Sequence, residues 1–339
     1  MGHIESSHSA GIGTVGQVAF SNNNTRAIYV ASTITSSDLA VYAGELFSWK
    51  IPRSVNRRIL KAITAIPYPI GASLPDTPLT TEACISFDHN NQPMHYVVSA
   101  LNTGERTNNG QIPHLITDLS KIASSNKYRP QSGKEMIKWV RQHGVPDFRL
   151  LQINPSNFLL FQNALQDVYA AVFSSYPYDI VEYIKQTCRD NCYVVAVENA
   201  TDKVLSITGA EMLNVAGIPI AEIGDSASQP GISGLGTVVK RFLFQTLIEQ
   251  NRVPALAFTD SRLARDYGVI KANIRAGLIL DPRIILPNHT QISSSVHPAH
   301  TVSIRGANGT IIQVENMTMM YADGNKIKQV ISQYGGISQ

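Results

Sequence analysis

The segment IPIAEIGDSASQPGISGLGTV, residues 218–238, decides the fold that we expect for this chain. Its first half, IPIAEIGDSA, has the composition of a strand that ends in polar residues. A glycine-rich turn, PGISGLG, follows it, and Thr237 to Gln250 then has the spacing of a long helix. The first amides of a helix lack intrahelical partners and lie at the positive end of its dipole, so this turn suits a pyrophosphate. A glycine turn before a helix is more often only a turn, and the surrounding sequence has to decide.

The segments around this turn alternate between helical and strand patterns. Before it, the residue spacing predicts helices from about Ser156 to Tyr176 and from Ile180 to Arg189, then strands that start at Cys192, Lys203 and Ile218. After it, we expect a buried strand VPALAFTD, a helix from Arg262 to Gly277, and strands near 284–294 and 310–321. This order predicts an α/β fold, a mixed β-sheet flanked by helices, over residues 146–339.

Residues 1–145 are harder to interpret, and we expect an additional α+β region of unknown function there. The run Arg26 to Ser32 alternates like a strand, Pro52 to Ile66 has the spacing of an amphipathic helix, and ACISF with HYVVSAL reads as a hairpin. A polar segment from Gly104 to Lys134 follows. We therefore place a domain boundary near residue 145.

Composition excludes several classes of protein. The 339 residues carry a net charge of +3 and are 43% hydrophobic, which is ordinary for a globular chain and too weakly basic for a protein that tracks phosphates. We expect no nucleic-acid partner and no membrane span, and the three cysteines indicate a reducing, cytoplasmic environment. Cys188 and Cys192 lack neighbours with zinc-ligand spacing, so no metal is expected either.

Several separated motifs resemble one family in the right order. VFSSYPYDIVEYIKQTCRDNCYVVAVENATDKVLSITGAEM, then AEIGDSASQPGISGLG, SRLARDYGVIKANIRAGL, LPNHTQIS and ENMTMMYA are similar to the GNAT superfamily of acyl-CoA-dependent N-acetyltransferases, and within it to the β-lysine N-acetyltransferase branch. The resemblance covers about residues 156–322, and it implies a GNAT-like fold with acetyl-CoA as acyl donor. Fold-level similarity does not determine the acceptor.

The resemblance also implies a cofactor site. The superfamily turn R/Q-x-x-G-x-G/A falls here on a run in which Gly236 is kept, while Ser233 and Val238 replace the usual residues. Strand IAEIGDSA, residues 220–227, would splay from its neighbour and pair with the pantetheine arm. The residues that would bind the cofactor are Ser226, Ala227, Ser228, Ser233, Gly234, Leu235, Gly236, Thr237 and Val238.

For the reaction, the resemblance implies Glu222 as the base that takes a proton from the amine, with Asp225 as second choice. A backbone amide near Ser226 to Ser228 would stabilise the oxyanion. Many members of the superfamily protonate the leaving thiolate with a tyrosine, but Asn273 stands at that position, and Tyr267 is the substitute candidate. Each of these side chains also has an ordinary structural interpretation.

The resemblance implies that the first helices and the last strands recognise the acceptor. The residues expected to bind it are Tyr176, Asn288, Thr290 and Glu315. Glu315 would face an ammonium group. The leading hypothesis is transfer of an acetyl group to the primary amine of a small amino-acid-like molecule, by direct attack in a ternary complex. The alternatives are a protein acceptor recognised by residues 1–145, and a non-catalytic GNAT-fold binding module. The resemblance to the superfamily is the sole basis for expecting a homodimer.

Overall fold

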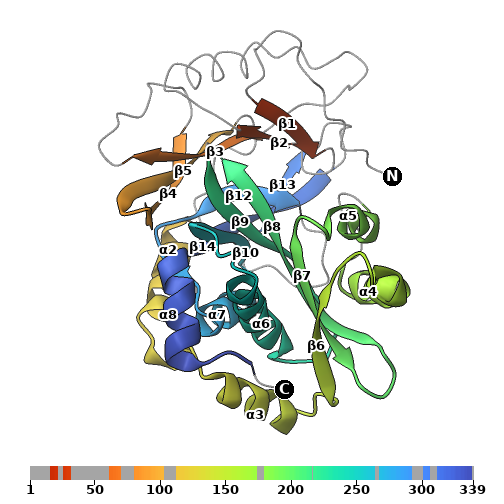
Figure 1. The fold of residues 1–339 in the computed structure, drawn as a ribbon. Coiled ribbons are helices and arrows are strands. Elements are labelled where there is room, and N and C mark those ends of the chain that lie inside the picture. The colour runs from red at the N-terminus through yellow and green to blue at the C-terminus, as the bar shows by residue number, and fades with distance from the viewer. Residues whose placement is uncertain are drawn as a thin grey trace.

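The structure is a computed structural model that describes residues 16–21, 26–31, 61–69, 80–102, 112–173, 179–215, 217–263, 267–291, 301–305 and 311–337. These residues form a larger mixed sheet with helices on both faces and a smaller sheet that lies over part of it (Figure 1).

The larger sheet has nine strands, and its main path runs β11-β14-β10-β9-β8-β7-β6. Neighbouring strands are antiparallel except β9 and β10, which are parallel. The strands are β6 (Phe148–Ile153), β7 (Cys192–Glu198), β8 (Val204–Val215), β9 (Ile218–Ser228), β10 (Leu256–Arg262), β11 (Ile279–Leu280), β12 (Leu286–Gln291), β13 (Thr301–Arg305) and β14 (Ile311–Asp323). The expectation of a mixed sheet flanked by helices is confirmed.

A different set of helices covers each face of this sheet. On one face lie α2 (Ile112–Ala123), η2 (Asn126–Tyr128), α3 (Gly133–Gln142), α6 (Leu235–Glu249), α7 (Gly268–Ala276) and α8 (Gly324–Tyr334), and their apolar side chains share one core with β7 to β10. On the other face lie α4 (Phe158–Val172) and α5 (Ile180–Thr187), which pack on β6 to β9 (Figure 1). Burial of these apolar faces supplies the main stabilisation of the layers.

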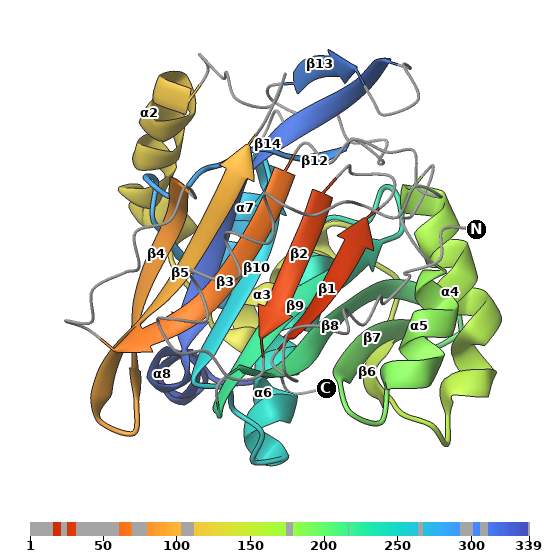
Figure 2. The same cartoon turned by 90° about the horizontal axis from the view of Figure 1, so that it is seen from above.

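The smaller sheet has the order β1-β2-β3-β5-β4 and covers the rest of the α4 and α5 face (Figure 2). Its strands are β1 (Gly16–Ser21), β2 (Arg26–Ala31), β3 (Lys61–Pro69), β4 (Thr80–His89) and β5 (Gln92–Asn102). Buried residues of β4 and β5 form one cluster with residues of β9, β10 and β14. The two sheets therefore share a core.

Two expectations for the N-terminal half are confirmed and one is wrong. The strand at Arg26 is β2, and the hairpin is β4 with β5. The helix expected at 52–66 is wrong over its second half, because Lys61 to Pro69 is a strand between β2 and β5. Ile63 fits a helical spacing, but its segment pairs with β2 on one side and β5 on the other, so tertiary pairing overrides local spacing. Residues 52–60 lie outside the described residues.

Several element boundaries also differ from the expectations. The segment read as polar contains α2 and the start of α3, and β13 lies between the strands expected near 284–294 and 310–321. Helix α7 begins only at Gly268, because β10 continues through Arg262. Helices α2 and α3 bury Leu119, Met136 and Val140 in the core of the larger sheet, so the boundary expected near residue 145 falls inside the segment that builds this core.

Candidate functional site

Strands β9 and β10 separate halfway along their length. Their parallel pairing runs from Ile220 opposite Leu256 to Glu222 opposite Phe258. Beyond that point β9 continues to Ser228, paired with β8, and β10 continues to Arg262, paired with β14. No pairing between β9 and β10 follows Glu222 in the described residues. The β9 backbone edge that faces the gap can therefore pair with an extended ligand.

A β-bulge lies just past this separation. The register of β8 and β9 shifts between Ile207 and Gly209, so that Asp225 and Ser226 share one position of the partner strand. Asp225 has a left-handed φ of 51°, and the Tyr169 hydroxyl donates to its carbonyl oxygen at 2.5 Å. The hydroxyls of Thr208 and Ser226 are 2.6 Å apart. Bulges re-aim the residues around them, and here the affected residues are those expected to bind the cofactor and the oxyanion.

Glu222 lies among other ionisable side chains on the face covered by α4, α5 and the smaller sheet. Glu211 is directly opposite it on β8, and the Tyr183 hydroxyl donates to Glu211 Oε1 at 2.7 Å. Two like charges at opposed positions destabilise a sheet. Burial raises the pKa of the Tyr96 hydroxyl, and the charges of Glu222 and Asp260 raise it further. Tyr96, from β5, therefore lies near the carboxylates of β9 and β10.

The glycine turn ends in a helix that begins at Leu235, two residues earlier than expected. Gly234 is the N-cap with a left-handed φ of 78°, a conformation that favours glycine. The amides of Thr237 and Val238 donate to the Gly234 carbonyl at 3.0 and 3.4 Å. Among the described residues, none accepts a hydrogen bond from the amides of Leu235 and Gly236. These two amides are available to an anion.

A small crevice adjoins this turn. It is lined by Gln131, Met136, Trp139, Val140, Gly234, Thr237 and Arg275. Arg275 comes from α7, its guanidinium carbon lies 5.5 Å from the centre of the Tyr128 ring, and its buried Nε has no hydrogen-bond partner in the described structure. A guanidinium from a different helix thus reaches the wall of the crevice beside the turn.

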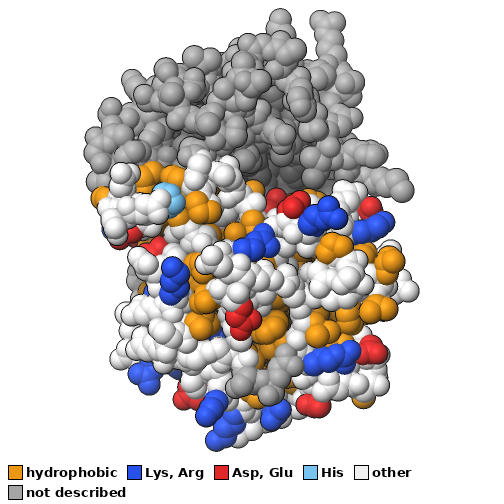
Figure 3. Space-filling view, viewed as in Figure 1, with side chains coloured by type: hydrophobic (Ala, Val, Ile, Leu, Met, Phe, Trp, Pro, Cys, Tyr) orange, Lys and Arg blue, Asp and Glu red, His pale blue; other side chains and the backbone are white. Residues whose placement is uncertain are grey.

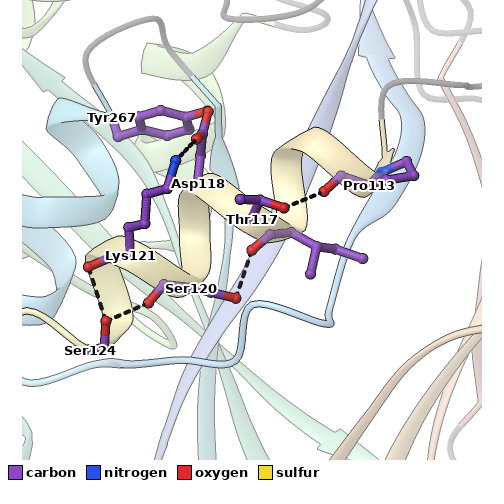
Figure 4. Close-up of polar contacts among 8 residues, drawn as sticks. Pro113, Thr117, Asp118, Ser120, Lys121, Ser124 and Tyr267 are labelled. Carbon is purple, nitrogen blue, oxygen red and sulfur yellow. Dashed lines mark hydrogen bonds and ion pairs between the residues drawn. The ribbon is translucent and has the colours of Figure 1, made fainter.

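Tyr267, the candidate proton donor, and Asn273, which stands at the usual tyrosine position, both have partners inside the protein. The Tyr267 hydroxyl donates to Asp118 Oδ2 of α2 at 3.2 Å (Figure 4). Burial and the Asp118 charge raise the Tyr267 pKa to about 12. Asn273 is fully buried in α7, and its Nδ2 donates to Ser261 Oγ on β10 at 2.8 Å. Both side chains therefore contribute to packing between α7 and its neighbours.

The residues expected to bind the acceptor are only partly described. Glu315 is buried in β14 and forms an ion pair with Arg262 Nη1 at 2.8 Å. The cation that faces it in the described structure is therefore an arginine of the protein and not the ammonium group of an acceptor. Burial raises the Glu315 pKa more than Arg262 lowers it. Thr290 lies opposite Glu315 in the backbone register, and Asn288 is in the same strand, β12. Tyr176 lies outside the described residues.

Sequence analysis missed Tyr96, Trp139, Arg275 and Glu211 as neighbours of the site. They lie on β5, α3, α7 and β8. No local motif marks such residues, because their proximity arises only when distant segments pack together.

Solved acetyltransferase structures match about half of this chain. An aminoglycoside 6'-acetyltransferase type Ii is 15% identical and covers 52% of this chain and 97% of its own, with a TM-score of 0.36. A ribosomal-protein-S5-alanine acetyltransferase from Vibrio fischeri is 10% identical and covers 53% and 95%, with a TM-score of 0.36. No protein-family model and no curated protein matches the chain.

Metal and membrane features are absent from the part of the chain that the structure describes. In these ranges, no three His, Cys, Asp or Glu side chains lie close enough together to hold a metal ion. None of the helices there is both long and apolar enough to span a bilayer. Acidic and basic side chains of the described residues are interspersed on the face seen in Figure 3.

Proposed function

We propose that this chain is an acetyl-CoA-dependent N-acetyltransferase of the GNAT superfamily, closest to its β-lysine N-acetyltransferase branch. The observation that carries the proposal is that β9 and β10 separate at Glu222 while the same strand β9 leads directly into the turn of α6. The open edge of β9 can pair with the pantetheine arm of the cofactor. The free amides at the start of α6 can bind its pyrophosphate.

The residues present fit such a cofactor. The amides of Leu235 and Gly236 would hold the pyrophosphate, with Ser233, Gly234, Thr237 and Val238 shaping the turn. The edge of β9 from Ser226 to Ser228, with Ala227 between them, would pair with the pantetheine arm. Among the described residues outside its own helix, a Cβ at Gly236 would come within 4 Å of Ser228 Oγ alone, at 3.4 Å. Bound acetyl-CoA would supply an activated acyl thioester.

Glu222 is the proposed base. It is half-buried at the last paired position of β9, where the two strands begin to open. It would take the proton that the amine loses as it attacks, and Asp225 is the second candidate. An amide between Ser226 and Ser228 would stabilise the oxyanion, and its position is set by the bulge. Tyr267 would donate a proton to the thiolate only after its hydroxyl leaves Asp118.

The proposed acceptor is the primary amine of a small amino-acid-like molecule, attacked directly in a ternary complex. The smaller sheet packs on the face of β9 and β10 that carries Glu222, so the approach to this carboxylate is covered by the protein itself. This arrangement favours a small acceptor over a protein chain. Tyr176, Asn288, Thr290 and Glu315 remain proposed acceptor residues, with Glu315 acting alongside Arg262.

A non-catalytic module is the second candidate, and the indole of Trp139 packed against the turn favours it. Calorimetric titration with acetyl-CoA separates the two. We expect saturable binding by the wild type and at least a tenfold loss in Gly236→Asp, which places a carboxylate beside the pyrophosphate at the second position of α6. Asn325→Asp puts the same charge at the second position of α8 and is the matched control. Absence of binding at millimolar acetyl-CoA would support the module instead.

A further inference from the structure

The smaller sheet contributes a side chain to the candidate active site. Strands β4 and β5 bury Ile85, Met94 and Tyr96 against Ile220 and Phe258 of β9 and β10. In the view of Figure 2, β5 and β3 lie above β10 and β9. The face of the larger sheet that α4 and α5 leave open, which also carries Glu222, is therefore covered by the N-terminal strands.

Tyr96 is the member of this contact that approaches the carboxylates. Its ring packs on Phe258 with centroids 5.3 Å apart and an interplanar angle of 32°. Phe258 is the residue of β10 that lies opposite Glu222, and Asp260 is two positions further along the same face of that strand. Tyr96 therefore packs on the face of β9 and β10 that carries both carboxylates.

No described residue forms a hydrogen bond with the Tyr96 hydroxyl. The residue is 3% exposed. A hydroxyl in such a largely buried residue can hydrogen-bond to a ligand that binds beside it. Such a group near the proposed base points to a ligand that binds between them. Burial and, after it, the charges of Glu222 and Asp260 raise the pKa of this phenol above its ordinary value, so the hydroxyl carries its proton at neutral pH.

We propose that Tyr96 binds the acceptor amine, an inference that rests on the proposed acetyltransferase function. The phenol oxygen accepts a hydrogen bond from one amine N–H, and this places the nitrogen beside Glu222, which takes a proton from it. The smaller sheet then has a defined role, because it supplies one wall of the acceptor site and limits acceptors to small amines that fit beneath it.

The test compares Tyr96→Phe with the wild type in steady-state assays of thiol release from acetyl-CoA. Spermidine, lysine methyl ester and kanamycin serve as probe amines, and the one with the fastest turnover is used for the comparison. Tyr96→Phe keeps the ring on Phe258, so the packing is preserved. We expect KM for the amine to rise about tenfold while KM for acetyl-CoA stays within twofold of the wild type.

Tyr321→Phe is the matched control. Tyr321 lies opposite Phe258 on β14 and packs against the same cluster, but its hydroxyl lies near Asp281 and Arg283 instead. Its two KM values should equal those of the wild type. Equal amine KM values for Tyr96→Phe and the wild type would overturn the role of Tyr96 and leave the proposed function standing. Failure of the wild type to turn over any probe or to bind acetyl-CoA would reject both.

Discussion

The indole of Trp139 lies against the backbone of Gly234, at the N-terminus of α6. A Cβ at residue 234 would come within 2.3 Å of Trp139 Cζ3 and 2.6 Å of Cε3. Trp139 is in turn stacked on His143, with ring centroids 3.7 Å apart. Helix α3 therefore holds the outer side of the turn that we propose to bind the pyrophosphate, and this contact leads to the first prediction.

Gly234→Ala should destabilise the protein and weaken its binding of acetyl-CoA. A residue with a Cβ in this left-handed backbone conformation costs about 1–2 kcal/mol. The new methyl group would also overlap the Trp139 ring, which adds to this cost. Gly144→Ala is the matched control, because Gly144 has a φ of 75° with nothing within 4 Å of its Cβ position. Denaturant unfolding should show a clearly larger loss for Gly234→Ala. Equal losses would mean that Trp139 does not constrain the turn.

Glu222→Gln should lower kcat about 100-fold or more while the dissociation constant for acetyl-CoA stays near that of the wild type. The amide keeps the shape of the side chain but cannot take a proton from the amine. Glu249→Gln, an exposed carboxylate in α6, controls for loss of one negative charge. Stopped assays with a probe amine and calorimetry measure the two quantities. Unchanged turnover in Glu222→Gln would remove this residue from the role of base.

Arg241→Met should reduce the free energy of unfolding by about 3 kcal/mol or more. The side chain is fully buried and donates to the carbonyl oxygens of Ala276, Arg275 and Gly335, each at 3.1 Å. Methionine fills a similar volume but leaves these carbonyls without their donor, which costs roughly 1–3 kcal/mol for each buried group. Chemical denaturation measures the loss. A loss below about 1 kcal/mol would show that water replaces the guanidinium.

Lys240→Met should stabilise the protein at neutral pH. Lys240 is 6% exposed, and burial lowers its pKa from 10.5 to about 8, so the folded state holds the proton less tightly than the unfolded state. The lysine therefore costs stability below pH 8, and this cost disappears as the pH rises from about 8 to 10.5. The full cost is on the order of 3 kcal/mol.

Unfolding of Lys240→Met and of the wild type, measured at pH 7 and pH 10, checks this prediction. The advantage of the variant should be large at pH 7 and much smaller at pH 10. Lys326→Met, at a partly exposed lysine in the first turn of α8, is the matched control for loss of one positive charge. A difference for Lys240→Met that does not change with pH would assign the effect to packing alone.

The second half of the chain could be predicted well because its local signals agree with its tertiary structure. Strands β7, β8 and β9 and helix α5 occur where the apolar patterns predict them. Local spacing failed at Ile63, where a helical and a strand pattern fit the same residues and pairing with two neighbours decided the outcome. Short apolar segments such as Phe148–Ile153 were missed for the same reason, since a strand of this length has little periodicity to read.

The candidate site divides in the same way. Sequence alone determined the strand, the glycine turn and the helix around residues 218–249, because glycine conformation and hydrophobic period act over a few neighbouring residues. Only the tertiary structure decided that β9 and β10 open at Glu222, that Arg262 pairs with Glu315, and that Tyr96 and Trp139 reach the two ends of the site. These contacts join segments far apart in the chain, and their formation depends on how the two sheets and the helices pack, which no local pattern encodes.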